Sequence, residues 1–399
     1  MPIVRFISVA ALCHLAFVAT RFSVSLYAID KDASAFTVGV ILSLFSVIPM
    51  LISVRIGKWI DSVGPFIPTA VGIFLTGTGA ILPLVFSYET ADLAPLLVSA
   101  CLVGTGFTFS ILSMQQYLGE LSAPGKRFVV FSWFAMGVSI SGFLGPVLGG
   151  VLIDEFSHRL SFLLPLGVSI CAGLLLFFTQ KNKRTIANRV SSSKITNPFQ
   201  LFRYKELRDV LIITGLISMC WDLQNFVIPL HGSKIGLSAS KIGFILGSFA
   251  LATFAIRLLM PLITKYTTEW QILISTLACA SVCFFIFPFI ETYLFFLLIA
   301  FVLGLGLGSA QPNIMTLVHS TAPEGRIAEA LGLRLTIIHA NLVALPLIFG
   351  AFGAALGTSA IFWIISALAF GGALLAIKKK KHLNSVGGKK KFDLKSKGN

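Results

Sequence analysis

Long apolar runs without any charge dominate this chain of 399 residues. No charged residue lies between Asp61 and Glu89, or between Asp92 and Glu120. About 20 apolar residues cross a bilayer as a helix, so each of these gaps is long enough for one span. The runs are continuous rather than alternating, which excludes a transmembrane β-barrel. Only 12% of the residues are charged, against about 25% in soluble domains, and the composition therefore excludes a soluble globule.

The charge-free stretches predict an all-α membrane protein with twelve transmembrane helices. We expect the spans near residues 4–28, 37–54, 66–86, 94–114, 128–152, 160–179, 209–230, 240–262, 271–290, 293–317, 331–353 and 357–377. The chain has 31 Lys and Arg residues. The loops on one side of the bilayer contain only Lys31, Arg159, Lys234 and Lys241, Arg21 lies inside the first span, and the others lie on the opposite side. Positive residues favour the cytoplasmic side, so both termini are predicted to be cytoplasmic, in a bacterial-type inner membrane.

A basic stretch divides the chain into two halves. Residues 180–208 are rich in Lys and Arg and predict a cytoplasmic linker. The linker would join an N-terminal six-helix bundle at 1–179 to a C-terminal six-helix bundle at 209–377. Residues 378–399 would then form a basic cytoplasmic tail.

The two halves repeat each other at an offset of about 200 residues. Pro146 is matched by Pro346. Phe22, Leu26, Ala35, Gly39, Ile41, Leu42 and Phe45 recur as Phe226, Leu230, Ala239, Gly243, Ile245, Leu246 and Phe249. An even number of spans separates the repeats, so both have the same orientation. The pattern predicts two pseudo-symmetric six-helix bundles around an axis normal to the membrane, an arrangement that supports alternating access.

A segment with regularly spaced glycines and an aspartate joins predicted spans 2 and 3. It reads Gly57-Lys-Trp-Ile-Asp61-Ser-Val-Gly64. Glycines allow a tight turn, and an Asp near a helix N-terminus is favoured by the free N–H groups there. The segment resembles the GxxxDxxG loop signature of the major facilitator superfamily, although positions 62, 65 and 66 lack the basic residues usual in that family. The resemblance implies the twelve-helix fold of that family and a role for Gly57, Asp61 and Gly64 in holding the cytoplasmic side closed. The alternative is that Asp61 is an ordinary loop carboxylate.

A second glycine-rich segment ends span 5 and reads Gly145-Pro146-Val-Leu-Gly149-Gly150. Small residues let helices approach closely, and proline kinks a helix. The segment resembles the GPxxGG antiporter motif of the same superfamily, which implies export by exchange, commonly against protons. The arginine that many exporters of the family carry in span 4 is absent here. The alternative is simple packing of a glycine-rich helix.

Few ionisable residues lie at depth in the spans, and such residues are costly there and are candidates for function. His14 and Arg21 share one face of span 1, and Asp222 lies in span 7. At 1.5 Å per residue, Asp222 and Arg21 lie about 18 Å and about 20 Å from the inner edge. Spans 1 and 7 face each other across a central cavity in the resembling fold. We therefore expect Arg21 and Asp222 to interact, with Asp222 as the candidate proton-coupling group. The alternative is that both line a wet vestibule without coupling.

Uncharged polar residues give weaker indications. Asn225 shares a face of span 7 with Asp222, and Gln311 and Asn341 are further candidates for the pathway. Hydrogen bonding between helices is the alternative for each of them. Arg257 lies near a cytoplasmic span end, where snorkelling of its side chain to the interface explains it.

Several kinds of chemistry are not indicated. The six cysteines have neither CxxC nor CxxH spacing, so no disulfide framework or zinc site is expected. A GxxxxGK[ST] loop is absent, which argues against direct ATP drive. The basic residues flank the spans instead of covering one soluble face, so nucleic acid is not an expected partner. We expect no enzyme activity, no cofactor and no metal.

The sequence thus predicts a secondary active transporter that moves a small molecule across the inner membrane by alternating access. Proton-coupled export is the leading hypothesis. One alternative is an importer or facilitator of a metabolite or an anion attracted by Arg21, and another is a receptor or scaffold that kept the fold but lost transport. The expected partners are a small-molecule substrate, protons as the candidate coupling ion and the lipid bilayer, and we expect a monomer. The substrate and the direction of transport stay open.

Overall fold

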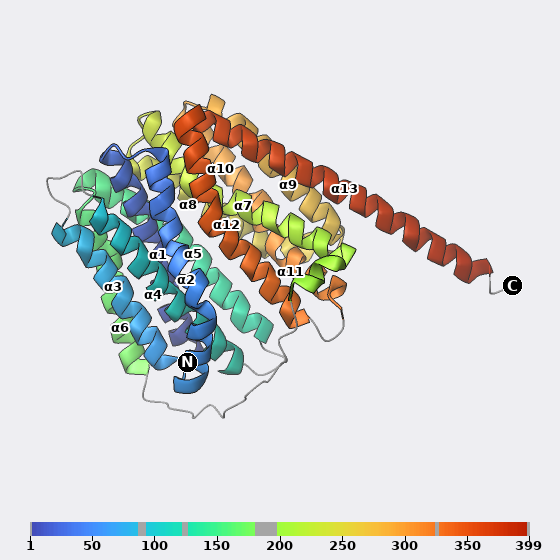
Figure 1. Ribbon diagram of the computed structural model, residues 1–399, viewed down its shortest axis with the longest axis horizontal. Coiled ribbons are helices and arrows are strands. Elements are labelled where there is room, and N and C mark those ends of the chain that lie inside the picture. Colours follow the sequence, from blue (N-terminus) through green and yellow to red (C-terminus); the bar gives the residue numbers. More distant parts are fainter. Residues whose placement is uncertain (1, 87–92, 122–126, 180–197, 324–326, 397–399) are drawn as a thin grey trace.

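The computed structural model describes residues 2–86, 93–121, 127–179, 198–323 and 327–396, which contain helices and no strand (Figure 1). The helices are α1 (Pro2–Asp30), α2 (Ala35–Val63), α3 (Phe66–Phe86), α4 (Ala94–Leu121), α5 (Arg127–Glu155), α6 (Leu163–Thr179), α7 (Lys205–Lys234), α8 (Ala239–Ile263), α9 (Glu269–Ile286), α10 (Tyr293–Gly308), α11 (Ala310–Thr321), α12 (Ile327–Leu356) and α13 (Thr358–Ser396). Three short 3-10 helices lie at Leu160–Phe162, Pro198–Arg203 and Phe287–Phe289. Within the described residues, 12 candidate spans are long and apolar enough to cross a membrane, which confirms the predicted twelve-span, all-α fold.

Several helices run past the predicted spans. The glycine- and aspartate-containing segment was expected to be a loop, but residues 57–63 form the last two turns of α2. The helix ends only at Gly64, whose φ is 80° and whose N–H donates a hydrogen bond to the carbonyl of Ile60 at 2.8 Å. A positive φ suits glycine, so the sharp stop is at Gly64 rather than at Gly57. The helix thus carries its charged residues beyond the apolar run.

The C-terminal half contains a broken span and a long final helix. One candidate span, Tyr293–Val318, consists of α10 and α11, which meet at Ser309. The helix α13 continues from its span through the predicted basic tail to Ser396 and projects beyond the rest of the fold (Figure 1). Residues 180–197 of the predicted linker lie outside the described residues, and the domain boundaries stay a prediction.

Helices of the two halves meet chiefly in two pairs. Within the first half, α1 packs on α5 and α6, and α3 packs on α4 and α6. Within the second half, α8 packs on α10, α9 on α13, and α7 on α12. The two halves join where α5 packs on α8 and where α2 packs on α12. The molecule has an N-terminal face, where α1 begins and α2 ends, and a far face, where α2 and α8 begin and α5 ends.

Both pairs close tightly at the far face, and they use repeat-related residues. A Cβ on Gly39 of α2 would overlap the carbonyl oxygen of Pro346 in α12, and a Cβ on Gly243 of α8 would overlap that of Pro146 in α5. The repeat seen in the sequence therefore becomes two equivalent helix contacts across the halves. Only glycine allows backbones to approach this closely.

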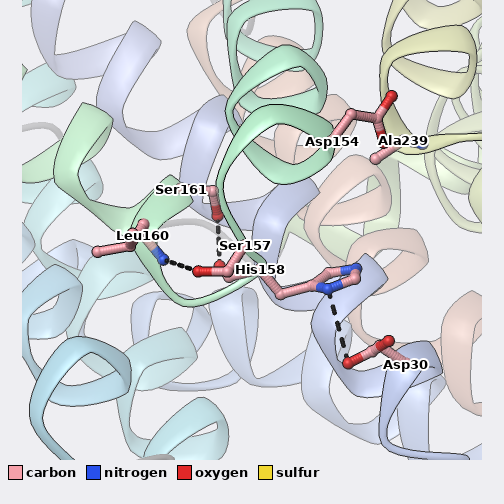
Figure 2. Close-up of polar contacts among 7 residues, drawn as sticks. All are labelled: Asp30, Asp154, Ser157, His158, Leu160, Ser161 and Ala239. Atoms are coloured by element: carbon pink, nitrogen blue, oxygen red, sulfur yellow. Dashed lines mark hydrogen bonds and ion pairs between the residues drawn. The ribbon is translucent and has the colours of Figure 1, made fainter.

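A carboxylate adds a polar contact to one of these pairs. Asp154, at the end of α5, accepts hydrogen bonds from the backbone N–H groups of Ala239 and Ser240, both at 2.9 Å. These N–H groups open α8, where a negative charge is favoured. Figure 2 shows Asp154 directed at Ala239, and His158, in the loop that follows α5, directed at Asp30 at the end of α1.

The loop that follows α5 contacts the end of α1. The Nδ1 of His158 lies 3.6 Å from a carboxylate oxygen of Asp30, and its ring stacks on Tyr27 at 5.7 Å between centroids. Burial lowers the pKa of the His158 imidazole below its ordinary value, although the carboxylates of Asp30 and Asp154 act in the opposite direction. At neutral pH the loop therefore holds a neutral imidazole against Asp30.

We expect Asp154→Ala to loosen the far face. The change removes two hydrogen bonds from the start of α8, and loss of such a cap costs about 0.5–2 kcal/mol. Spin labels at the far-face ends of α5 and α8, measured by electron–electron double resonance, should show a larger share of long distances. Glu155→Ala is the matched control, because it removes the same charge from an exposed neighbour. Equal distance distributions in the two variants would contradict this expectation.

Candidate functional site

A cavity of about 880 Å³ lies between the two halves. Its walls come from α1, α2, α4, α5, α7, α8 and α12. The lining runs from Phe22 and Pro146 at mid-depth to Gly57 and Ile60 in the last turns of α2. Because the far face is closed by the α5–α8 and α2–α12 contacts, the cavity is reached from the N-terminal face. Its volume is within the roughly 300–1,000 Å³ of small-molecule sites.

The structure places Arg21 and Asp222 on the wall of the same cavity. The two charges act on each other through space, but no ion pair within the described residues joins them. The Nε of Arg21 and the Oδ2 of Asp222 are both buried without a hydrogen-bond partner in the described part of the chain. Buried polar atoms of this kind are normally satisfied, so both groups are free to bind a substrate, a proton or water.

His14 and Asn225 also line the cavity, beside an aromatic wall. The Nδ1 of His14 lies 2.7 Å from the Oγ of Ser141 in α5. The rings of Phe17 and Phe107 stack at 4.2 Å. The Nδ2 of Asn225 donates to its own helix, at the carbonyl of Trp221, which leaves the amide oxygen available. The wall thus combines apolar rings with a few polar atoms.

Gln311 and Asn341 are not among the residues that line the cavity. The Oε1 of Gln311 accepts a hydrogen bond from the Nη2 of Arg334 at 2.7 Å, which ties α11 to α12. The Nδ2 of Asn341 donates to the carbonyl of Gly215 at 2.8 Å and to the Oγ of Ser218 at 2.6 Å, which ties α12 to α7. Both residues therefore form hydrogen bonds between helices, which was the alternative to a position in the transport pathway.

The contacts of Asn341 and Asn225 lead to opposite expectations. Asn341→Ala removes two interhelical hydrogen bonds and should lower stability by about 1 kcal/mol, the usual size of such bonds in membranes. Asn225→Ala removes a bond within one helix and should leave stability unchanged while altering ligand affinity. Thermal unfolding in detergent, followed by ligand titration, measures both quantities. A large affinity change in Asn341→Ala at unchanged stability would contradict its assignment to packing.

The two motif segments are placed differently. In the segment at the end of span 5, Pro146 lines the cavity, while Gly145 packs against Val18 of α1, Gly149 against Phe22 of α1, and Gly150 against the carbonyl of Ala239 at the start of α8. This segment therefore holds α5 between α1 and α8. In the segment near the end of α2, Gly57 lines the cavity and Gly64 ends the helix. The side chain of Asp61 lies outside the part that the structure describes.

Arg257 in α8 is a charged residue of the described cavity wall that sequence reasoning did not assign to the pathway. Its side chain does not extend to the membrane interface, contrary to the expectation from the sequence. Its Nη1 donates to the Oγ of Ser139 at 3.0 Å, and its guanidinium lies 5.9 Å from the centre of the Trp221 ring. The sequence contained a pattern that could have predicted this position. Phe249, Thr253 and Arg257 are spaced four residues apart and therefore share one face of the helix.

Comparisons with known proteins agree with this architecture. The sequence profile of the Major Facilitator Superfamily matches residues 6–340. The uncharacterized MFS-type transporter YuxJ of Bacillus subtilis (strain 168) is 28% identical over 318 residues, which cover 76% of this chain and 79% of the relative. Multidrug resistance protein 1 of the same organism is 22% identical, with 73% of this chain and 75% of the relative covered.

The fold also matches solved structures. The peptide transporter POT in complex with sulfate superposes with a TM-score of 0.75 at 16% identity and covers 96% of this chain and 94% of its own. A POT family transporter in complex with a thioalcohol-conjugated peptide gives a TM-score of 0.77 at 14% identity, covering 95% and 96%. These likenesses concern the fold, and the matching family consists of transporters rather than enzymes. The chain therefore belongs to the major facilitator superfamily and is a secondary transporter of small molecules.

Proposed function

We propose that this transporter exports a small molecule in exchange for protons. The observation that carries the proposal is the pair of unpartnered charged groups, Arg21 and Asp222, in a cavity open to the N-terminal face. The distribution of Lys and Arg supports a cytoplasmic N-terminal face, so the cavity would receive its substrate from the cytoplasm. The similarity to a multidrug resistance protein and, over 39% of this chain, to the efflux pump azaK of Aspergillus niger supports export.

The transport cycle alternates the side on which the cavity is open. In the conformation described above, the far face is held by the two glycine contacts and by Asp154. Opening to the far side requires the α5–α8 and α2–α12 pairs to separate while the N-terminal ends of the halves approach. The halves then rock about the mid-depth residues that line the cavity, as in other transporters built from parallel repeats.

Asp222 is the group that carries the proton in this cycle. It is the single acidic residue among the described residues of the cavity wall, and its Oδ2 is free. Protonation removes its attraction for Arg21, and deprotonation restores it. The charge balance of the cavity therefore changes with the proton, and that change couples proton movement to the conformational equilibrium.

Flux in proteoliposomes with an imposed pH gradient tests the proposal. We expect protein-dependent movement of a transported compound against its gradient when the protons run in the opposite direction, with proton movement recorded by an entrapped dye. The panel should contain anionic, neutral and cationic small molecules. Movement of the compound in the same direction as the protons would support an importer. Flux that does not depend on the pH gradient would support a facilitator. Binding without flux in either direction would support a receptor.

A further inference from the structure

We infer that the transported substrate is an amphipathic organic anion and that Arg257 anchors its negative group. This inference rests on the proposed transport function and specifies its substrate class. The described residues of the cavity wall include two arginines, Arg21 and Arg257, and one carboxylate, Asp222. The described part of the cavity wall thus holds an excess of positive charge.

The two arginines are not equivalent. Arg21 interacts electrostatically with Asp222, whose charge offsets its own. Arg257 forms no ion pair with any acidic side chain in the part of the chain that the structure describes. Its one hydrogen bond to a side chain there goes to the neutral hydroxyl of Ser139, which uses one of the five N–H donors of a guanidinium. A partly buried cation at low dielectric favours a counter-ion, and the substrate is the group that can supply one.

The neighbourhood of Arg257 defines the rest of the ligand. Trp221 lies beside the guanidinium, and its ring meets Phe249 edge-on at 5.1 Å. On the opposite wall, Phe45 and Phe107 contact Phe17 at 5.7 Å and 4.2 Å between ring centroids. Flat apolar groups pack well on such rings. A sulfonate or carboxylate carried by an aromatic or other apolar body therefore matches the wall better than a cation, which Arg21 and Arg257 repel.

An anionic substrate has a consequence for the energetics of exchange. Export of a monovalent anion removes one negative charge from the cell, and entry of one proton adds one positive charge. Both steps make the cell interior more positive. An inside-negative membrane potential should therefore accelerate the exchange. One-for-one exchange of a monovalent cation for a proton is electroneutral and would not respond to the potential.

A pair of permanently charged probes tests the inference by calorimetry on the purified full-length protein. We expect 1-naphthalenesulfonate to bind at least tenfold more tightly than naphthyltrimethylammonium. Arg257→Gln should weaken sulfonate binding about 10- to 100-fold, as expected for loss of one charge-assisted hydrogen bond. Arg257→Lys should restore part of it, which shows that the site is folded. Lys265→Gln is the matched control, because it removes a positive charge just beyond α8 from an exposed residue outside the cavity wall.

Three results would overturn the inference: tighter binding of the cation, absence of binding by both probes, or equal sulfonate affinity in wild type and Arg257→Gln. Its failure is separable from failure of the proposed function. Intact pH-driven flux without preference for anions contradicts the substrate class alone. Selective sulfonate binding that depends on Arg257, without any flux, contradicts transport and leaves the anion site standing.

Discussion

Asp222→Asn should abolish proton-driven transport and leave energy-independent exchange of substrate in place. Asparagine keeps the size of the side chain but cannot gain or lose a proton. The cavity would lose the group whose charge changes during the cycle. We expect flux driven by a pH gradient to fall at least 100-fold in proteoliposomes. Exchange of labelled for unlabelled substrate across the membrane should change no more than about tenfold, since a buried hydrogen bond contributes about 0.5–1.5 kcal/mol and 1.4 kcal/mol corresponds to a factor of ten.

The comparison of driven flux with exchange separates coupling from binding or folding. A variant that fails to fold or bind loses both activities, and a coupling variant loses one. Asp209→Asn is a suitable control, because Asp209 is a carboxylate on the same helix that pairs with Lys379 at 2.9 Å, away from the cavity wall. Undiminished proton-driven flux in Asp222→Asn would show that the proton is carried elsewhere.

The double variant Gly39→Ala, Gly243→Ala should prevent closure of the far face. Each added Cβ would overlap a proline carbonyl of the opposing helix, and backbone cannot move aside as a flexible side chain does. Overpacking of this kind costs about 1–3 kcal/mol per site. Since 1.4 kcal/mol corresponds to a factor of ten, the closed-to-open ratio at the far face should fall at least tenfold. Net transport should fall to a similar degree, because the cycle requires each face to close in turn.

Two other glycines provide the control for this pair. A Cβ on Gly167 of α6 or on Gly371 of α13 meets no atom within 4 Å, so Gly167→Ala with Gly371→Ala should leave transport near wild type. Spin-label distances across the α5–α8 and α2–α12 pairs measure the far face directly. A closed far face in the Gly39 and Gly243 variant, with normal flux, would show that the helices have room that the structure does not indicate.

Much of the fold was predictable because the bilayer imposes a local rule on sequence. In lipid each backbone polar group must be satisfied within its own helix, so a charge-free run of sufficient length predicts a span. The predicted span 66–86 coincides with α3, and the repeat of Gly39 and Pro146 half a chain later reappears as two matched helix contacts. Helix ends were harder to predict. The charged last turns of α2 stay helical in the structure up to Gly64, because hydropathy marks the lipid boundary and not the end of the helix.

The candidate site was predictable only in part. Arg21 and Asp222 could be placed at similar depth by counting residues, because the rise of a helix is constant. The side that each residue faces depends on how a helix is rotated against its neighbours, and no local pattern contains that information. This is why Gln311 and Asn341 join helices, while Arg257, expected at the membrane interface, lies on the cavity wall.

Sequence alone determined that this protein spans the membrane with twelve helices in two related halves, and that very few charges lie at depth. These properties follow from the composition and spacing of apolar runs, which act within single helices. Tertiary structure decided which face of the molecule is closed and which polar groups share the cavity, where the described wall holds two arginines and one carboxylate. Those properties depend on contacts between helices that are far apart in the chain, such as α5 and α8. The close approach of the two backbones fixes how each helix is rotated, and this rotation determines which side chains line the cavity.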